Sequence, residues 1–328
     1  MNFSKLCIVG MTSLDAPITM PSSDIEKRIS PILTKFKMRP HIITELTGII
    51  ERRYWHEGTE PSDAATQVAQ NLFTKINFDK NNIDLIINSS VSKDCIEPSI
   101  AAIVHGNLEL KSECLNFDIG NACLAFLNSI EMAGALIEAG TIKHALIVNA
   151  ESSRLPVETT IKILQDAQVD EITFRKNFAT LTIGSGASAM ILSSSDYYPQ
   201  APKVVGAVNL AASKHHNLCK GQRDSMQTDA SGLLKAGLEL ALQTYQKACQ
   251  TLDWSNKNFK SFIIHQVSEI HTQKLCEVLG IPKDKLYPIF QKYGNVGPAS
   301  IPIALDKMIN ENTMQKGERL ALLGIGSG

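Results

Sequence analysis

The sequence predicts an α/β protein built from two similar halves, and three observations support this. Short β-branched runs alternate with helical patterns along the whole chain. Hydrophobic residues make up 44 % of the 328 residues and aromatic residues only 6 %, which is typical of α/β proteins rich in small and branched side chains. The order of strands, helices and Gly-Asn pairs in the first part of the chain returns in the second.

Seven short apolar runs are expected to form strands. They cover residues 6–9, 83–88, 145–149, 181–192, 203–210, 262–265 and 319–325. Amphipathic windows between them predict helices, chiefly over residues 64–76, 125–138, 232–252 and 301–308. Strands and helices that alternate in this way predict buried sheets with helices on both faces.

The repeat follows one order in each copy: a strand, a helix, a Gly-Asn pair, a second helix, a glycine and a final strand. The pair is Gly120-Asn121 in the first copy and Gly294-Asn295 in the second. Chance similarity between two α/β stretches is the alternative to a duplication. We predict two halves, 1–198 and 199–328, whose equivalent strand ends meet at the place where open α/β sheets bind ligands.

Bulk composition excludes several classes of protein. The net charge is −1 and no block of like charges is long, which argues against a nucleic-acid partner. The seven cysteines are scattered and form no C-x-x-C pair, which indicates a reducing cytoplasm and no metal site. No apolar stretch approaches the roughly 20 residues that span a membrane, and no export signal is visible. We expect a soluble cytoplasmic protein without a cofactor.

Cys123 is the candidate nucleophile. It lies in GNACLAF at residues 120–126, after a strand-like run and at the start of an apolar helix. The positive end of a helix dipole favours a thiolate over a thiol, and Gly120 and Ala122 indicate a tight elbow. Buried cysteines are more often small hydrophobes, and we expect that role for the other six.

His265 and Asn295 are the candidate partners of this cysteine. His265 follows an apolar strand, and Asn295 holds the place equivalent to Asn121 in a loop that opens a helix. A satisfied core histidine and a turn or N-cap asparagine are the structural alternatives. The duplication directs both loops at the centre where Cys123 lies. A sulfur nucleophile with imidazole and amide donors suits thioester chemistry.

These residues, in this order, resemble the thiolase superfamily and, within it, beta-ketoacyl synthase III. TGIIERR at 47–53, YGN at 293–295 and ASIPIAL at 299–305 carry the resemblance further, over nearly the whole chain. The resemblance implies a five-layer fold in which mixed sheets sandwich buried helices. It also implies that Cys123 accepts an acyl group while His265 and Asn295 stabilise negative charge on the thioester oxygen of the second substrate.

A narrower resemblance rests on KDCIEPS at 93–99, HGNL at 105–108 and GNVGPAS at 294–300. These stretches look like the OleA-type synthases, which join two fatty acyl-CoA molecules head to head into a beta-keto acid. The resemblance implies that Glu97 reaches across a homodimer interface as the base that removes an alpha-proton. An acyl-CoA has no carboxylate to lose, so a base is needed. A surface glutamate is the structural alternative.

The resemblance also suggests roles for Ser327, Arg52 and Arg53. The backbone N–H of Ser327, in the tail GIGSG at 324–328, would join that of Cys123 as an oxyanion hole. Relatives continue past this turn into a final strand, and a missing strand would put that geometry in doubt. Arg52 and Arg53 would meet the phosphates or adenine of coenzyme A at a tunnel mouth, solvated arginines being the alternative.

Three other functions stay open from the sequence. A beta-ketoacyl-ACP synthase III would condense acyl-CoA with malonyl-ACP, so an acyl carrier protein is a second candidate partner. Papain-like hydrolases use Cys, His and Asn in the same order, although the repeat argues against them. The last alternative is a non-catalytic thiolase-fold subunit that binds acyl chains.

Overall fold

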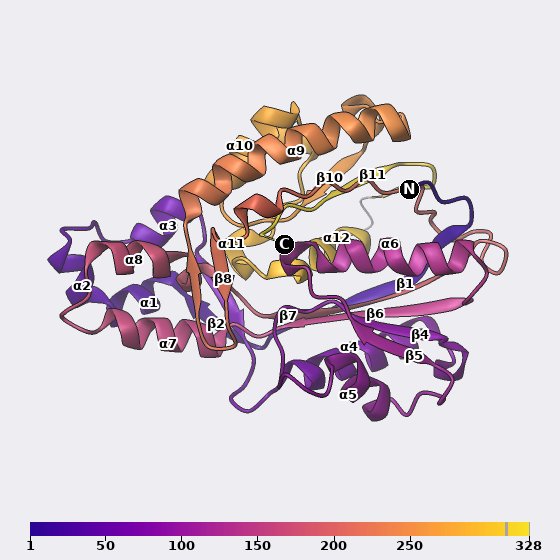
Figure 1. Cartoon of the computed structure of the whole chain (residues 1–328), viewed down its shortest axis with the longest axis horizontal. Coiled ribbons are helices and arrows are strands. Elements are labelled where there is room, and N and C mark those ends of the chain that lie inside the picture. The colour runs from indigo at the N-terminus through magenta and orange to yellow at the C-terminus, as the bar shows by residue number, and fades with distance from the viewer. Residues whose placement is uncertain (312–313, 328) are drawn as a thin grey trace.

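The computed structural model describes residues 1–311 and 314–327, and Figure 1 shows their arrangement in five layers. A five-stranded sheet and a two-stranded sheet lie on either side of a central helical layer, and further helices cover the outer face of each sheet. The central helices are α6 (Ala125–Glu138) and α12 (Ser300–Asn310). The outer helices are α4 (Pro61–Ile76), α5 (Ile100–Asn107), α9 (Ala230–Leu252) and α10 (Glu269–Leu279). The predicted α/β layering is confirmed.

The larger sheet is mixed, with strand order β1-β7-β6-β4-β5. Its strands are β1 (Leu6–Asp15), β4 (Leu85–Asn88), β5 (Leu115–Asp118), β6 (His144–Glu151) and β7 (Gly186–Ser194). Strand β4 runs parallel to β5 and β6, whereas β7 runs antiparallel to β1 and β6. This order leaves β5 at an edge of the sheet.

The strands alternate side chains between two apolar cores because successive residues of a strand face opposite sides of the sheet. Ala145 and Ile147 of β6 join the core around the central helices, whereas Leu146 and Val148 join the core under α4 and α5. Both faces of the sheet are therefore buried, which explains why its strands read as nearly continuous apolar runs.

The second half repeats the central part of the first. Strands β10 (Ser261–Ile264) and β11 (Leu320–Leu323) are parallel neighbours, as β4 and β6 are in the first half. Helix α12 precedes β11 as α6 precedes β6. A third core packs α9 and α10 on the outer face of this smaller sheet. The two halves thus direct the loops that open α6 and α12 toward each other, and the boundary at 198/199 stays a prediction.

Two of the expected strands differ in the structure. The strand expected over 203–210 is wrong: the segment makes only single bridges, Asn2 with Gly206 and Cys7 with Lys203. Pro202 has no N–H to donate, so a continuous ladder beside β1 cannot form there. The strand expected from residue 181 begins instead at Gly186, because residues 179–182 form a 3-10 turn.

The remaining elements form a cap at one end of the layers (Figure 1). They are α1 (Ser22–Arg28), α2 (Ser30–Lys35), α3 (Ile42–Thr47), α7 (Arg154–Leu164), α8 (Glu171–Phe178) and two antiparallel strand pairs, β2 (Ile18–Pro21) with β3 (Glu51–Tyr54) and β8 (Cys219–Gly221) with β9 (Met226–Thr228). The short helix α11 (Phe290–Tyr293) contacts β3, and its Tyr293 joins the core around the central helices. Most of this cap has its own apolar core. None of the described helices is long and apolar enough to cross a bilayer.

Candidate active site

Cys123 lies in the 3-10 turn Ala122–Leu124 (η2), directly before α6. The preceding Ala122 has a φ of 44°, in the left-handed region that non-glycine residues seldom adopt. This strained turn redirects the chain between β5 and α6 and is the elbow that the sequence predicted. Backbone strain of this kind clusters at functional sites.

The thiol of Cys123 is protonated at neutral pH. Desolvation by the surrounding protein, with smaller contributions from Glu151 and Cys219, raises its pKa to about 12. Desolvation therefore acts against the helix-terminus effect that we expect from the sequence. Burial opposes the thiolate charge, and the 3-10 turn holds Cys123 outside the first turn of α6.

The C-terminal segment runs directly beside Cys123. A Cβ placed on Gly326 would lie 3.0 Å from Cys123 Cβ and 3.4 Å from Cys123 N, and one on Gly324 would lie 2.6 Å from Leu124. Only glycine allows two backbones to approach so closely. Ser327 follows this contact, as its suggested part in an oxyanion hole requires, and Gly328 lies outside the described residues.

His265 is buried, with 1 % of its surface exposed, at the carboxyl end of β10. Its backbone N–H donates to Leu323 O at 2.8 Å, and its ring Nδ1 lies 2.8 Å from Ser300 Oγ. Desolvation lowers the pKa of His265 to about 3, so its imidazole is neutral. If Ser300 donates to Nδ1, Nε2 carries the ring proton and can act as a hydrogen-bond donor.

Asn295 is fixed on three sides. Its backbone N–H donates to Thr182 O, its carbonyl accepts from Gly184 N at 2.9 Å, and its side-chain Oδ1 accepts from Gly297 N at 3.0 Å. The last bond is the turn interaction expected of an asparagine in such a loop. Among the described residues its amide Nδ2 has no partner, which leaves two hydrogens for a ligand.

The segments that carry these three residues meet in the structure. The turn η2 around Cys123 contacts the 3-10 turn Gly297–Ala299 (η7), which follows Asn295. Ser300 follows η7 and bonds His265. Segments that are far apart in the sequence therefore converge where α6 and α12 begin, as the duplication predicted.

Glu97 lies on the surface, in the loop between β4 and α5. Its neighbour Ile96 is 97 % exposed, so the tip of this loop projects from the molecule. No contact described in the structure joins Glu97 to Cys123. Within a single chain, the candidate base is thus not part of the site.

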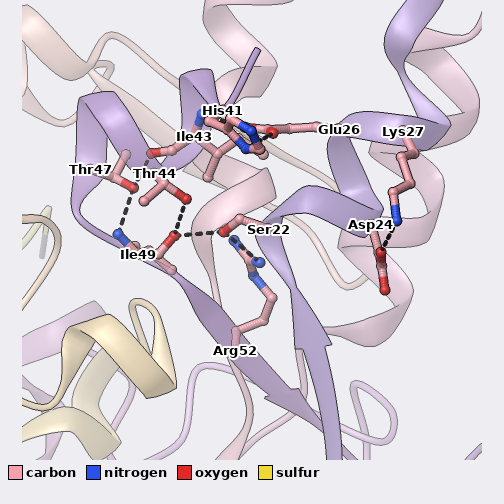
Figure 2. A network of polar contacts seen from close by, with 10 residues as sticks. All are labelled: Ser22, Asp24, Glu26, Lys27, His41, Ile43, Thr44, Thr47, Ile49 and Arg52. Atoms are coloured by element: carbon pink, nitrogen blue, oxygen red, sulfur yellow. Dashed lines mark hydrogen bonds and ion pairs between the residues drawn. The ribbon is translucent and has the colours of Figure 1, made fainter.

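Arg52 is not available to a ligand, and the prediction that it meets coenzyme A is wrong. It is 0 % exposed, and Figure 2 shows its guanidinium directed at Ser22, inside the cap. Its nitrogens donate to Met20 O at 3.2 Å, Ser22 Oγ at 3.0 Å and Leu181 O at 2.9 Å. Desolvation lowers its pKa to about 10. Arg52 joins β3 to β2, α1 and the turn before β7.

Arg53 points to the opposite side of β3 from Arg52 and is half-buried. Its guanidinium lies 5.4 Å from the centre of the Tyr293 ring, and Lys307 lies 5.1 Å from the same ring. Tyr293 in turn donates to Asp15 Oδ2 at 2.8 Å. A cation–π contact already engages Arg53, and its predicted role toward coenzyme A stays a prediction.

Glu151 is a buried carboxyl beside the site that the sequence reading missed. It ends β6, is 6 % exposed, and acts electrostatically on Cys123. Desolvation raises its pKa to about 7. An acidic residue two positions after the apolar run 145–149 was the available signal, because such a position lies at a strand's carboxyl end. Within the described residues, no cluster of three His, Cys, Asp or Glu could hold a metal.

Family sequence models match most of the chain. The one described as 3-oxoacyl-[acyl-carrier-protein] synthase III matches residues 117–211, and that of its C-terminal part matches residues 249–328. The one described as FAE1/type III polyketide synthase-like protein matches residues 32–159.

Three relatives match this chain over its whole length. An acyl-CoA:acyl-CoA alkyltransferase of Xanthomonas campestris is 40 % identical over 100 % of this chain and 97 % of its own length. A protein of the same name from Shewanella oneidensis is 32 % identical over the same shares. A beta-ketoacyl-[acyl-carrier-protein] synthase III of Natranaerobius thermophilus is 27 % identical, over 100 % of this chain and 97 % of its own length.

Solved structures agree with the sequence comparison. The cerulenin-bound crystal structure of Xanthomonas campestris OleA has a TM-score of 0.98 at 40 % identity, covering 100 % of this chain and 95 % of that one. Other structures of that protein carry a replaced cysteine, glutamate or histidine. One with bound lauric acid and lauroyl-CoA has a TM-score of 0.96 at 39 % identity, over 98 % of this chain and 95 % of that one. This chain therefore belongs to the 3-oxoacyl-[acyl-carrier-protein] synthase III family of acyltransferases with a thiolase-like fold.

Proposed function

We propose that this acyltransferase joins two acyl-CoA molecules head to head into a beta-keto acid, through an acyl thioester on Cys123. The observation that carries the proposal is full-length identity of 40 % and 32 % to two acyl-CoA:acyl-CoA alkyltransferases. The replaced glutamate, cysteine and histidine of the Xanthomonas protein also follow one another in the same order and at the same spacing as Glu97, Cys123 and His265.

In the first half-reaction, the Cys123 sulfur attacks the thioester carbonyl of an acyl-CoA. A carbon–sulfur bond to Cys123 forms, the bond to coenzyme A breaks, and the thiol proton leaves with coenzyme A. The backbone N–H groups of Cys123 and Ser327 would hold the negative charge that develops on the carbonyl oxygen. The close approach of Gly326 to Cys123 supports this pairing.

In the second half-reaction, Glu97 removes an alpha-proton from another acyl-CoA. The resulting carbanion attacks the acyl-Cys123 carbonyl and expels the Cys123 sulfur as a thiolate. One proton, equivalent to the one that Glu97 removed, returns through solvent to the sulfur, so that the thiol and the Glu97 carboxylate are both restored. Neutral His265 and the amide Nδ2 of Asn295 would stabilise the enolate oxygen, since each offers an N–H without a formal charge. Hydrolysis of the remaining thioester by water then gives the beta-keto acid and coenzyme A.

We expect a homodimer, because Glu97 is exposed and makes no described contact with the Cys123 of its own chain. Strand β5 is the edge of the larger sheet, and its Leu115 is 51 % exposed although it lies in a strand. An uncovered edge strand presents unpaired backbone groups to a second chain. We expect two copies to associate along this edge, so that the loop tip with Ile96 and Glu97 enters the partner's site. A monomer in light scattering at assay concentration would contradict this arrangement.

The second substrate decides between the two candidate reactions. The alternative is condensation of acyl-CoA with malonyl-ACP, which the 27 % identical synthase III relatives favour. Wild-type enzyme, pre-loaded with an acyl group, is offered either a second acyl-CoA or malonyl-ACP, and consumption of each is measured. We expect only acyl-CoA to be consumed, and consumption of malonyl-ACP would establish the alternative.

Acylation itself is tested by intact mass spectrometry. The wild-type chain should gain one acyl mass from acyl-CoA, and Cys123→Ala should gain none. Acyl-CoAs of graded length in the same experiment report the chain preference. All seven cysteines are free, so we assign the protein to a reducing compartment such as the cytoplasm.

A further inference from the structure

The Glu151 carboxylate holds the first residues of the loop that carries Glu97. Its Oε1 accepts from Val91 N at 2.8 Å, and its Oε2 accepts from Ser92 N at 3.1 Å and from Ser92 Oγ at 2.8 Å. Each carboxylate oxygen thus receives a backbone N–H of the same loop. Only a group with acceptors on both oxygens can make this pair of bonds.

The rest of the loop is fixed up to Asp94 and then projects. Lys93 Nζ lies 3.3 Å from Asp118 Oδ2, and Asp94 Oδ1 accepts from Ser62 N at 3.1 Å. Beyond this point, Cys95, Ile96 and Glu97 are exposed. The position of Glu97 therefore depends on anchors near the start of its loop, and Glu151 is a buried carboxylate among them.

The same carboxylate lies against the Cys123 site of its own chain. A Cβ on Gly297 would lie 3.8 Å from Glu151 Cδ, so Glu151 packs beside the loop that carries Asn295. The alternation of β6 directs Glu151 to the central layer, where α6 begins at the Cys123 turn. Its charge contributes to the raised pKa of the Cys123 thiol.

We propose that Glu151 is a positioning residue that couples the two sites of the dimer: it lies at the Cys123 site of its own chain and holds the loop that delivers Glu97 to the other. This rests on the proposed function, in which Glu97 acts across the interface. A change at one Cys123 site can then alter the position of the Glu97 that serves the other site.

Glu151→Gln tests the clamp with little change in size. The substitution replaces one carboxylate oxygen by an NH2 group, which cannot accept a hydrogen bond. One of the two backbone N–H groups of the loop then faces another donor, and this contact becomes repulsive. Because small misplacements of a catalytic group can reduce a rate about a hundredfold, we expect kcat for condensation to fall at least tenfold. Acylation of Cys123 in mass spectrometry should persist, and KM for acyl-CoA should change little.

Mixed dimers show in which site the defect lies. Chains with different affinity tags are co-expressed, and one chain carries Cys123→Ala so that the dimer has a single working site. Glu151→Gln on this Cys123→Ala chain should lower condensation at least tenfold, because that chain supplies Glu97 to the working site. Glu151→Gln on the chain that retains Cys123 should have a much smaller effect, because the loop that supplies Glu97 to the working site then keeps its anchor.

Two outcomes of the Glu151→Gln experiment overturn the proposal. If condensation is lost only when Glu151→Gln is on the chain that retains Cys123, Glu151 acts only at the site of its own chain. If condensation is unchanged in both placements, Glu151 has no role in positioning the loop. Glu97→Ala, placed on either chain in the same way, tests the proposed function separately. If it lowers condensation only when it is placed on the chain that retains Cys123, the base acts within its own chain and the proposed function needs revision.

Two further variants guard against simple misfolding. Asp306→Asn is the matched control, because Asp306 is also buried and accepts from a backbone N–H and a hydroxyl, both of Ser13. It should lower stability without a placement-dependent effect on condensation. Ser92→Ala removes the hydroxyl bond to Glu151, together with the contacts of Ser92 Oγ with Ser152 N and O, and leaves both backbone bonds of the clamp in place. It should give a weaker defect with the same placement pattern, and the reverse pattern would also overturn the proposal.

Discussion

Replacing Arg52 should destabilise the fold and leave substrate binding intact. The guanidinium is enclosed between β2, α1 and the turn before β7, and it donates to three oxygens of other segments. Figure 2 shows its contact with Ser22. Arg52→Ala leaves Ser22 Oγ and Leu181 O without this donor. It also leaves a cavity in place of one of the largest fully buried side chains.

The size of the effect follows from these contacts. Each buried acceptor left unpaired costs about 1–3 kcal/mol, and truncation of a large buried side chain costs about 2–5 kcal/mol. Burial of the cation itself is unfavourable, as the lowered pKa of Arg52 shows, and its removal offsets part of that sum. We expect a net loss of about 3 kcal/mol, a large share of the roughly 5–15 kcal/mol that stabilises a typical fold.

Urea denaturation measures this loss, and KM for acyl-CoA is measured on the protein that remains folded. Arg53→Ala, on the same strand, is the matched control for the stability measurement. It removes a cation–π contact with Tyr293 and should cost about 1 kcal/mol. A stability loss below about 1 kcal/mol for Arg52→Ala, together with a tenfold higher KM, would refute the structural role and restore the coenzyme A interpretation.

Three other changes probe the site. Gly326→Ala places a methyl 3.0 Å from Cys123 Cβ and should slow acylation about tenfold in stopped-flow assays; an unchanged rate would mean that the tail moves freely. Ser300→Ala removes the partner of His265 Nδ1 and should lower kcat about tenfold with KM little changed, whereas an altered KM alone would contradict this role. Glu151→Gln removes a negative charge that raises the Cys123 pKa, so iodoacetamide should alkylate Cys123 faster at pH 8; a slower reaction would reverse the assigned sign.

The sequence was sufficient to predict the residues that stand at ends of strands and helices. Cys123 could be found because a strand, a small-residue turn and an apolar helix follow one another locally. The repeat then pointed to Asn295 through Asn121, and an apolar strand pointed to His265. Local patterns decide such positions, and convergence follows from the duplicated topology.

Burial and side-chain direction required the structure. Arg52 and Arg53 are adjacent in one motif, yet the two-residue period of β3 places one in a closed core and the other against Tyr293. Glu151 carries no motif, and its importance comes from Val91 and Ser92, which are distant in sequence. Long-range packing decides these features, so no local pattern could reveal them.

The charge state of the site separates it from a papain-like hydrolase. Such enzymes rely on a cysteine whose pKa is lowered by a charged histidine. Here desolvation disfavours the charged form of both residues. It raises the Cys123 pKa to about 12 and lowers the His265 pKa to about 3. Neutral pH therefore leaves a thiol and a neutral imidazole, with no ion pair between them. A neutral imidazole keeps one N–H for the oxygen of an enolate and cannot readily protonate the carbanion that must form the new carbon–carbon bond.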